Sequence, residues 1–155
     1  MKYYYIAEIN LPSKSAYAVH VFQMCNALAK SKKNVILLVP YVPKSLLKKI
    51  KKEFGIEYNF KIKSIFSVKK ELNIFSRILF GKVCLKIIKN KKQKTFIISR
   101  SVISSLILAN NNIFNYLEIH HELKSFTKFF FYLFQNTKKK FFLKYILINK
   151  YLLNY

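Results

Sequence analysis

Three short stretches carry most of the side chains that could take part in chemistry. They are "INLPSKSAYAVH" (residues 9–20), "SRS" (residues 99–101) and "EIHHE" (residues 118–122). All three histidines and one of the two arginines lie in these stretches. Hydrogen-bond donors together with possible general acids and bases are typical of a site for a polar ligand.

Several common kinds of site are excluded by the sequence. The chain has no Asp and no GxSxG, so a Ser-His-Asp triad is excluded. GxGxxG and GxxxxGKS/T are absent, so a glycine-rich nucleotide loop in its usual form is excluded as well. The "HHE" run lacks the i, i+4 spacing of a helical zinc pair, and no Cys lies near it. We therefore expect no metal site.

Each of the three stretches follows a segment with the pattern of a strand. Six strands are predicted, over residues 3–9, 34–40, 58–66, 95–99, 113–119 and 144–148. Helical spacing predicts helices from about residue 15, and over residues 46–54, 73–89, 102–109 and 126–142. The alternation predicts one α/β domain over residues 1–155. We expect a three-layer Rossmann-like parallel sheet of about six strands, with helices on both faces and strand 3–9 at its centre.

The expected sheet also predicts where a ligand would bind. In such folds ligands lie outside the carboxyl ends of the strands, near the switch point between the first and fourth strands. The loop at residues 10–17, Arg100 and His120 are therefore expected to line one cleft. The free N–H groups of the first helix, with Ser13, Lys14 and Ser15, suit an anionic or hydroxyl-rich ligand.

Simpler roles are open for the same side chains. His20, taken alone, is expected more often to flank the apolar face of its helix than to bind a ligand. Arg100 could cap the sheet edge or pair with a glutamate. His120 and His121 are adjacent and point in different directions, so at most one is expected to face the cleft.

The chain is strongly basic, with 27 Lys and two Arg against six Glu, and a net charge of +23. A nucleic-acid surface normally uses Arg as well as Lys, so we favour codon bias for most of the lysines. The alternative is a basic single-domain module that binds nucleic acid or an anionic membrane. Lys82, Lys86, Lys89 and the Lys run at 138–140 would carry that function, with the Phe run at 129–131 as apolar anchors.

The sequence predicts a cytoplasmic location. Cys25 and Cys84 lie in predicted helices and form no CxxC pair, as expected for small buried hydrophobes in a reducing compartment. The N-terminal apolar run is too short for a signal peptide, and no segment offers the roughly 20 apolar residues needed to span a bilayer.

The run "LPSKSAYAVHVFQMCNALAKSKKNVILLVP" resembles the opening of the N-terminal domain of GT-B fold glycosyltransferases of family four. The runs "SRS" and "YLEIHHE" resemble two further motifs of that family, a Thr/Ser-Arg-Ser and a Glu-x-His at strand ends. "YILINKYLL" is similar to the last strand and following helix of the same domain. The resemblance covers nearly the whole chain.

This resemblance implies an acceptor-side domain of a retaining enzyme. Such enzymes transfer a sugar from a nucleotide-sugar to a glycan or lipid-linked acceptor, such as a cell-envelope polysaccharide. They usually need no metal, and we expect no cofactor. His120 matches the catalytic histidine that approaches the donor sugar. The predicted substrate-binding residues are Lys14, Ser15, Ala16, Tyr17, His20, Arg100, Glu118 and His121.

The chain also departs from the family pattern. Ala16 and Tyr17 stand where many members have Gly-Gly, and His121 stands where an Asp is usual. The nucleotide-binding C-terminal half is missing. We therefore expect a truncated or partial chain that is inactive alone, or a subunit completed by a separately encoded half. It would lie in the cytoplasm, peripheral to the inner face of the cell membrane.

Overall fold

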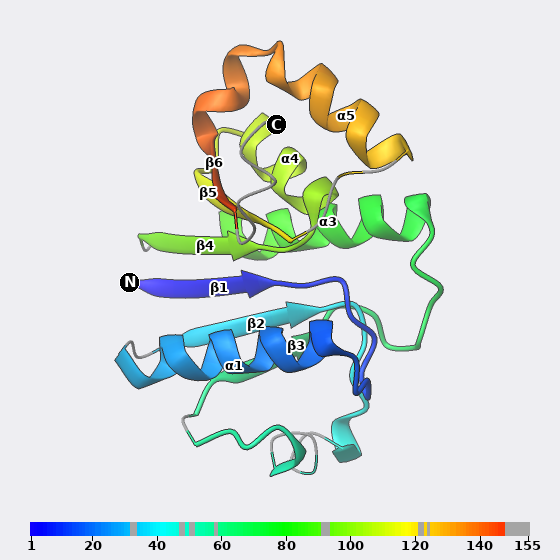
Figure 1. Ribbon diagram of the computed structural model, residues 1–155, viewed down its shortest axis with the longest axis vertical. Coiled ribbons are helices and arrows are strands. Elements are labelled where there is room, and N and C mark those ends of the chain that lie inside the picture. Colours follow the sequence, from blue (N-terminus) through cyan, green and yellow to red (C-terminus); the bar gives the residue numbers. More distant parts are fainter. Residues whose placement is uncertain are drawn as a thin grey trace.

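The computed structural model describes residues 1–31, 34–46, 49, 52–57, 59–90, 94–120, 123 and 125–147. It shows a six-stranded, all-parallel sheet with helices on both faces (Figure 1). The strands are β1 (Lys2–Ile6), β2 (Val35–Val39), β3 (Lys61–Ser64), β4 (Thr95–Ser99), β5 (Asn115–Ile119) and β6 (Leu143–Leu147), in the order β3-β2-β1-β4-β5-β6. The predicted Rossmann-like fold is confirmed, and so is the central position of the first strand.

In the described part of the chain, four α-helices flank this sheet. They are α1 (Ala16–Ser31), α3 (Ile74–Lys89), α4 (Val102–Asn110) and α5 (Ser125–Gln135). Two short 3-10 turns lie in connections to strands: η1 (Lys44–Leu46) between β2 and β3, and η2 (Lys138–Phe142) between α5 and β6. Helix α1 covers one face, while α3, α4 and α5 pack on the other. Strands β1 to β5 are thus each connected by a crossover to the strand that follows in the chain, as expected for a parallel sheet with both faces buried.

The core forms because neighbouring residues of β1 point to opposite faces of the sheet. Tyr5 packs with Phe22 and Cys25 of α1, whereas Tyr4 and Ile6 pack on the face that holds Phe80 and Cys84 of α3. All of these side chains are at most 2% exposed. Burying one large apolar side chain stabilises a fold by about 1.5–3 kcal/mol. Both cysteines are unpaired and fully buried, as predicted.

Helices α3 and α4 approach each other closely at Gly81. A Cβ atom at this position would lie 2.7 Å from Ile107 Cδ1 and 3.2 Å from the backbone Cα of Ser104. A side chain at this position would require Ile107 to shift and would press on the backbone of α4. The close contact fixes the surface that α3 and α4 present away from the sheet.

The structure corrects the length of the last predicted helix. A helix was expected over residues 126–142, but α5 ends at Gln135 and η2 follows. Thr137 has an extended backbone, and its N–H and hydroxyl both donate to the Phe134 carbonyl. These two bonds end the helix before the lysine run.

Other predicted elements also differ at their ends. The first strand ends at Ile6 rather than at residue 9, and the fifth begins at Asn115 rather than at residue 113. The third strand is shorter than the predicted 58–66, because β3 pairs with β2 only over Lys61–Ser64. The helix predicted over residues 46–54 falls partly outside the described residues. Among the described helices, none has both the length and the apolar character needed to cross a membrane.

Candidate functional site

A buried carboxylate, Glu118, lies at the centre of the candidate site. Its side chain is fully buried. Oε2 accepts a hydrogen bond of 2.5 Å from the Tyr5 hydroxyl, and Oε1 lies 2.7 Å from His20 Nε2. His120 Nε2 also bonds to Oε1, and Arg100 Nε lies 3.9 Å from the same atom. We call these five residues the Glu118 cluster.

The fold brings these residues together from distant parts of the chain. Tyr5 extends from β1 toward α1, and His20 faces it from the second turn of α1. Arg100 follows β4 directly, while Glu118 and His120 lie at the end of β5. Because parallel strands end at the same edge, the cluster lies at the carboxyl edge of the sheet, where β1 and β4 are neighbours. This is the switch point at which such folds bind ligands.

The pKa shifts in the cluster define its protonation state. Burial alone would raise the pKa of Glu118, but hydrogen bonds from Tyr5, His120 and His20 and the charge of Arg100 hold it below its usual value. Burial lowers the pKa of His120, and Arg100 lowers it further, although the bond to Glu118 acts in the opposite direction. Glu118 is therefore ionised and His120 neutral at neutral pH. An ionised carboxylate only accepts hydrogen bonds, so His120 carries its proton on Nε2.

Arg100 is held in the cluster by the aromatic ring of Tyr17. The guanidinium carbon lies 4.1 Å from the centre of the ring, and the Arg100 side chain is only 6% exposed. Burial raises the pKa of Tyr17 to about 12, so the phenol stays neutral. Nη1 of Arg100 is buried without a hydrogen-bond partner in the described part of the chain. A donor left unpaired in this way costs about 1–3 kcal/mol, so a ligand oxygen that reached it would be bound favourably.

A second polar network lies beside the cluster, at the end of β1. The Ser101 hydroxyl donates to Glu8 Oε1 at 2.5 Å, and Arg77 Nε lies 3.5 Å from Glu8 Oε2. Ser101 also caps α4, because its Oγ accepts a 3.0 Å bond from the Ser104 N–H. Burial raises the pKa of Glu8, and the contacts with Ser101 and Arg77 only partly offset this.

The structure unites some of the predicted site residues and separates others. Tyr17, His20, Arg100, Glu118 and His120 lie together, as described above. Ser15 instead caps α1, since its Oγ accepts a 3.2 Å bond from the Ala18 N–H, and Ser13 supports it with a 3.0 Å bond. Lys14 and Ala16 are exposed and make no contact with the cluster among the interactions described. His121 lies outside the described residues.

Sequence reasoning missed several members of the site. Tyr5 lies in an apolar strand and Arg77 in a helix, and neither position carries a local signal. Glu8 follows β1 directly, so the switch-point rule could have included it. His20 was predicted as a substrate-binding residue, with a place beside the apolar helix face as the simpler alternative, and it bonds to Glu118 through a ring nitrogen.

Three side chains of the cluster offer the atoms that a metal ion would need. One ligand atom each from His20, Glu118 and His120 lies within 4.8 Å of the others. The local spacing of "HHE" could not show this group, because its members come from α1 and β5. The charge of Arg100 beside Glu118 disfavours a second cation, and both histidines already bond to the carboxylate. The absence of a metal stays a prediction.

The chain matches no protein-family model, no curated protein and no solved structure. The fold and the geometry of the Glu118 cluster are therefore the basis for a functional proposal.

Proposed function

We propose that this chain is the N-terminal, acceptor-side domain of a retaining GT-B glycosyltransferase. The enzyme would transfer a sugar from a nucleotide-sugar to a glycan or a lipid-linked acceptor. The observation that supports this best is the Glu118 cluster, in which a neutral imidazole, a buried carboxylate and a buried guanidinium meet at the switch point of the sheet. This arrangement suits a ligand that carries hydroxyl groups and a phosphate.

Each residue has a chemical role in this proposal. His120 contacts the donor sugar, and Glu118 orients its ring through the bond at Nε2, while burial and the charge of Arg100 favour the neutral imidazole. Arg100 binds an anionic group of the ligand, for which its unpaired Nη1 supplies a donor. Tyr17 packs over the face of the guanidinium and holds it in place, while the N–H donors lie in the guanidinium plane. No cofactor is needed, because the nucleotide-sugar is itself the activated substrate.

A second domain would have to complete this site. In a two-domain enzyme, closure supplies orientation and excludes water. The Glu118 cluster provides only one side of such a site, so we expect no sugar transfer by residues 1–155 alone. The coding DNA downstream of Tyr155 offers a direct check, because a frame or neighbouring gene for a nucleotide-binding half would support the proposal.

Binding can be tested on the chain itself by NMR of its histidine side chains. A panel of nucleotide-sugars and glycan or lipid-linked acceptors is titrated into the full chain, and the ring signal of His120 is assigned from a His120→Gln variant. We expect one ligand class to shift the ring signal, and Arg100→Lys to weaken the binding about tenfold, because the planar fork is lost. Absence of any shift would contradict the proposal. Lys14→Ala is the matched control, since Lys14 lies outside the cluster.

A specific observation also favours a second candidate function, binding to an anionic membrane. Helix α5 exposes Phe126, Phe129 and Tyr132, which are 70%, 57% and 67% exposed. One lysine from each of the two groups, Lys89 and Lys139, contacts the C-terminal end of α4. Lys89 Nζ bonds to Asn111 at 2.9 Å, and Lys139 Nζ bonds to the next residue, Asn112, at 2.5 Å.

Nucleic acid is a weaker candidate for this basic face. Both arginines of the chain are engaged elsewhere, Arg77 with Glu8 and Arg100 with Glu118. The exposed aromatic groups on α5 suit the interface of a bilayer, and exposed lysines attract anionic headgroups. A peripheral position at the inner face of the cell membrane would follow from this function.

Vesicle co-sedimentation tests this second function. We expect the chain to bind vesicles that contain phosphatidylglycerol, to leave them as salt is raised, and to bind phosphatidylcholine vesicles only weakly. Equal binding to the anionic and the neutral vesicles would contradict this function and would favour codon bias as the reason for the high lysine content. A Phe129→Ser, Tyr132→Ser variant should lose binding, whereas Phe75→Ser on α3, where Phe75 is 78% exposed, serves as the control.

A further inference from the structure

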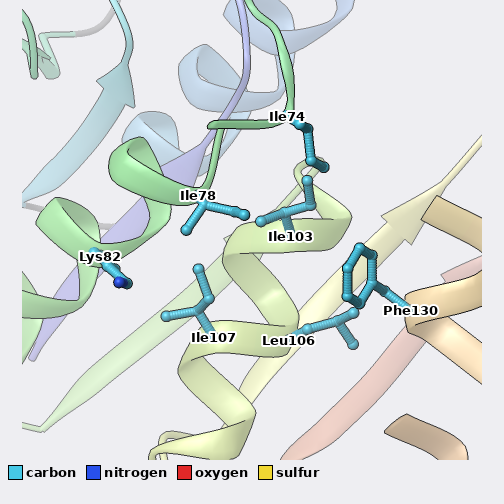
Figure 2. Close-up of a pocket in the computed structure, with 7 residues that line it drawn as sticks. All are labelled: Ile74, Ile78, Lys82, Ile103, Leu106, Ile107 and Phe130. Atoms are coloured by element: carbon cyan, nitrogen blue, oxygen red, sulfur yellow. The ribbon is translucent and has the colours of Figure 1, made fainter. Parts of the chain in front are cut away.

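An apolar pocket of about 230 Å³ lies between α3, α4 and α5 (Figure 2). It is lined by Ile74 and Ile78 of α3, Ile103, Leu106 and Ile107 of α4, and Phe130 of α5. Figure 2 shows Lys82 and Phe130 on opposite sides of this group, with the aliphatic side chains between them. The pocket lies on the outer side of the helices, away from the Glu118 cluster on the α1 face of the sheet.

The chemistry of the lining limits what can bind there. The surface that faces the pocket is wholly apolar, so a polar group placed inside would lose its hydrogen bonds to water without replacement. An engineered apolar cavity of about 150 Å³ is large enough to bind benzene, so this pocket can hold a larger hydrocarbon segment. Such a ligand would be held by area burial alone.

Lys82 adds a charge at the rim. The side chain is exposed, and its methylene groups line the pocket. A lysine placed in this way keeps its ammonium group in water at the mouth of an apolar site. An occupant with an apolar chain and an anionic head would therefore match both the interior and the rim.

Phe130 connects the pocket to the exposed aromatic residues of α5. Its ring lines the pocket, is 41% exposed and packs at 5.9 Å, centre to centre, against Phe129. An exposed apolar surface of this kind marks an interaction site. The pocket thus opens beside the surface to which we assign membrane binding.

We propose that this pocket holds one hydrocarbon chain of an anionic membrane lipid, with the lipid headgroup at Lys82. The choice of a bilayer lipid as the source rests on the proposed membrane binding and is independent of sugar transfer. One lipid chain drawn into the pocket would anchor α5 against the bilayer. The basic chain is attracted to an anionic membrane by charge alone, and the pocket would add specificity for particular lipids.

A soluble single-chain probe tests the pocket without a bilayer. Dodecyl phosphate, below its micelle concentration, is titrated into the full chain by calorimetry, with dodecyltrimethylammonium as the probe of opposite charge. We expect dodecyl phosphate to bind about fivefold more tightly, as one lysine near an anionic group allows, and Lys82→Ala to remove the difference. Failure of dodecyl phosphate to bind, or equal affinity for the two probes in the unaltered chain, would overturn the proposal.

Two neighbouring residues of α3 provide a matched pair of variants. Ile78 lines the pocket, whereas Leu79 is 45% exposed and does not. Ile78→Trp fills the pocket and should weaken binding of dodecyl phosphate at least about tenfold, while Leu79→Trp should leave it unchanged. Leu106→Trp fills the pocket from α4, and circular dichroism confirms that each variant is folded.

The vesicle experiment separates this proposal from the membrane function on which it rests. The chain could bind anionic vesicles while neither Ile78→Trp nor Leu106→Trp changes the binding of dodecyl phosphate. That result would overturn the lipid site in the pocket and leave the proposed membrane binding unaffected. Loss of vesicle binding in the α5 variant, with binding of dodecyl phosphate retained, would support the pocket as a separate site. A phosphatidic acid with a photoreactive chain should label α3 or α4 in vesicles, and labelling elsewhere would contradict the assignment.

Discussion

The Tyr5 hydroxyl donates a 2.5 Å hydrogen bond to Glu118, across the strand that separates them. Tyr5 belongs to β1 and Glu118 to β5, while β4 lies between them and is followed by Arg100. The bond therefore connects three strands at the edge where the candidate site lies. It also fixes the carboxylate that orients His120.

Removal of this hydroxyl should destabilise the protein. In Tyr5→Phe the buried carboxylate loses one of its donors, so we expect the free energy of unfolding to fall by about 1–3 kcal/mol in urea denaturation. Tyr3→Phe is the control on the same strand, because the Tyr3 hydroxyl makes only a long, exposed contact of 3.7 Å with Met1 Sδ. An equal effect of the two substitutions would show that the bond to Glu118 contributes nothing.

Stability should depend on pH through His120. Its pKa is lower in the folded protein than the usual 6.5, so the unfolded chain takes up the proton first as the pH falls. The free energy of unfolding should therefore decrease as the pH falls below about 6.5, and His120→Gln should reduce this slope. A slope that is unchanged in the variant would contradict the assignment of a neutral His120.

Glu118 should give a second, more acidic loss of stability. Its pKa lies below the usual 4.5 in the folded protein, so its contribution is fully present above pH 4.5 and is lost as the pH falls through the folded value. Glu118→Gln should remove this acid-dependent step in urea denaturation. It should also cost about 3 kcal/mol near neutral pH, because Arg100 is left buried without its carboxylate.

Ser101 should contribute more than an ordinary helix cap. Asn73 caps α3 with a 2.9 Å bond to the Ser76 N–H, and its replacement by alanine should cost about 1 kcal/mol. Ser101→Ala removes the cap of α4 and also the donor to Glu8, so the loss should be about 1 kcal/mol greater. Thermal or urea denaturation of the two variants measures the difference, and equal losses would mean that the bond to Glu8 is not stabilising.

Zinc should not stabilise the folded protein. His20, Glu118 and His120 are close enough to bind an ion, but the guanidinium of Arg100 opposes one. We expect the melting temperature to be the same with zinc chloride and with EDTA. A rise with zinc that disappears in His20→Ala would identify a metal site instead.

The local sequence pattern was sufficient to predict where the strands lie and at which edge of the sheet the site lies. The strand predicted at 95–99 agrees with β4 to the residue, because a short run of apolar residues with flanking polar ones is a local signal. The meeting of Arg100 with His120 followed from the shared edge of parallel strands. The bonds of Tyr5 and His20 to Glu118 were not predictable, because they depend on the register of three strands and on the rotation of α1. The end of α5 was missed because Thr137 stops the helix through backbone conformation, and the apolar periodicity does not report that.

The bonds that Glu118 makes to distant parts of the chain affect the lifetime of the folded protein. Tyr5 and His20 lie 113 and 98 residues from Glu118 along the chain, and we expect these bonds to form late in folding, once the sheet has assembled. Contacts made after the transition state change the rate of unfolding and leave the rate of folding nearly unaltered. Tyr5→Phe should therefore speed unfolding in stopped-flow measurements while refolding proceeds at its original rate. The Glu118 cluster would then govern the lifetime of the folded state rather than the speed at which it is reached.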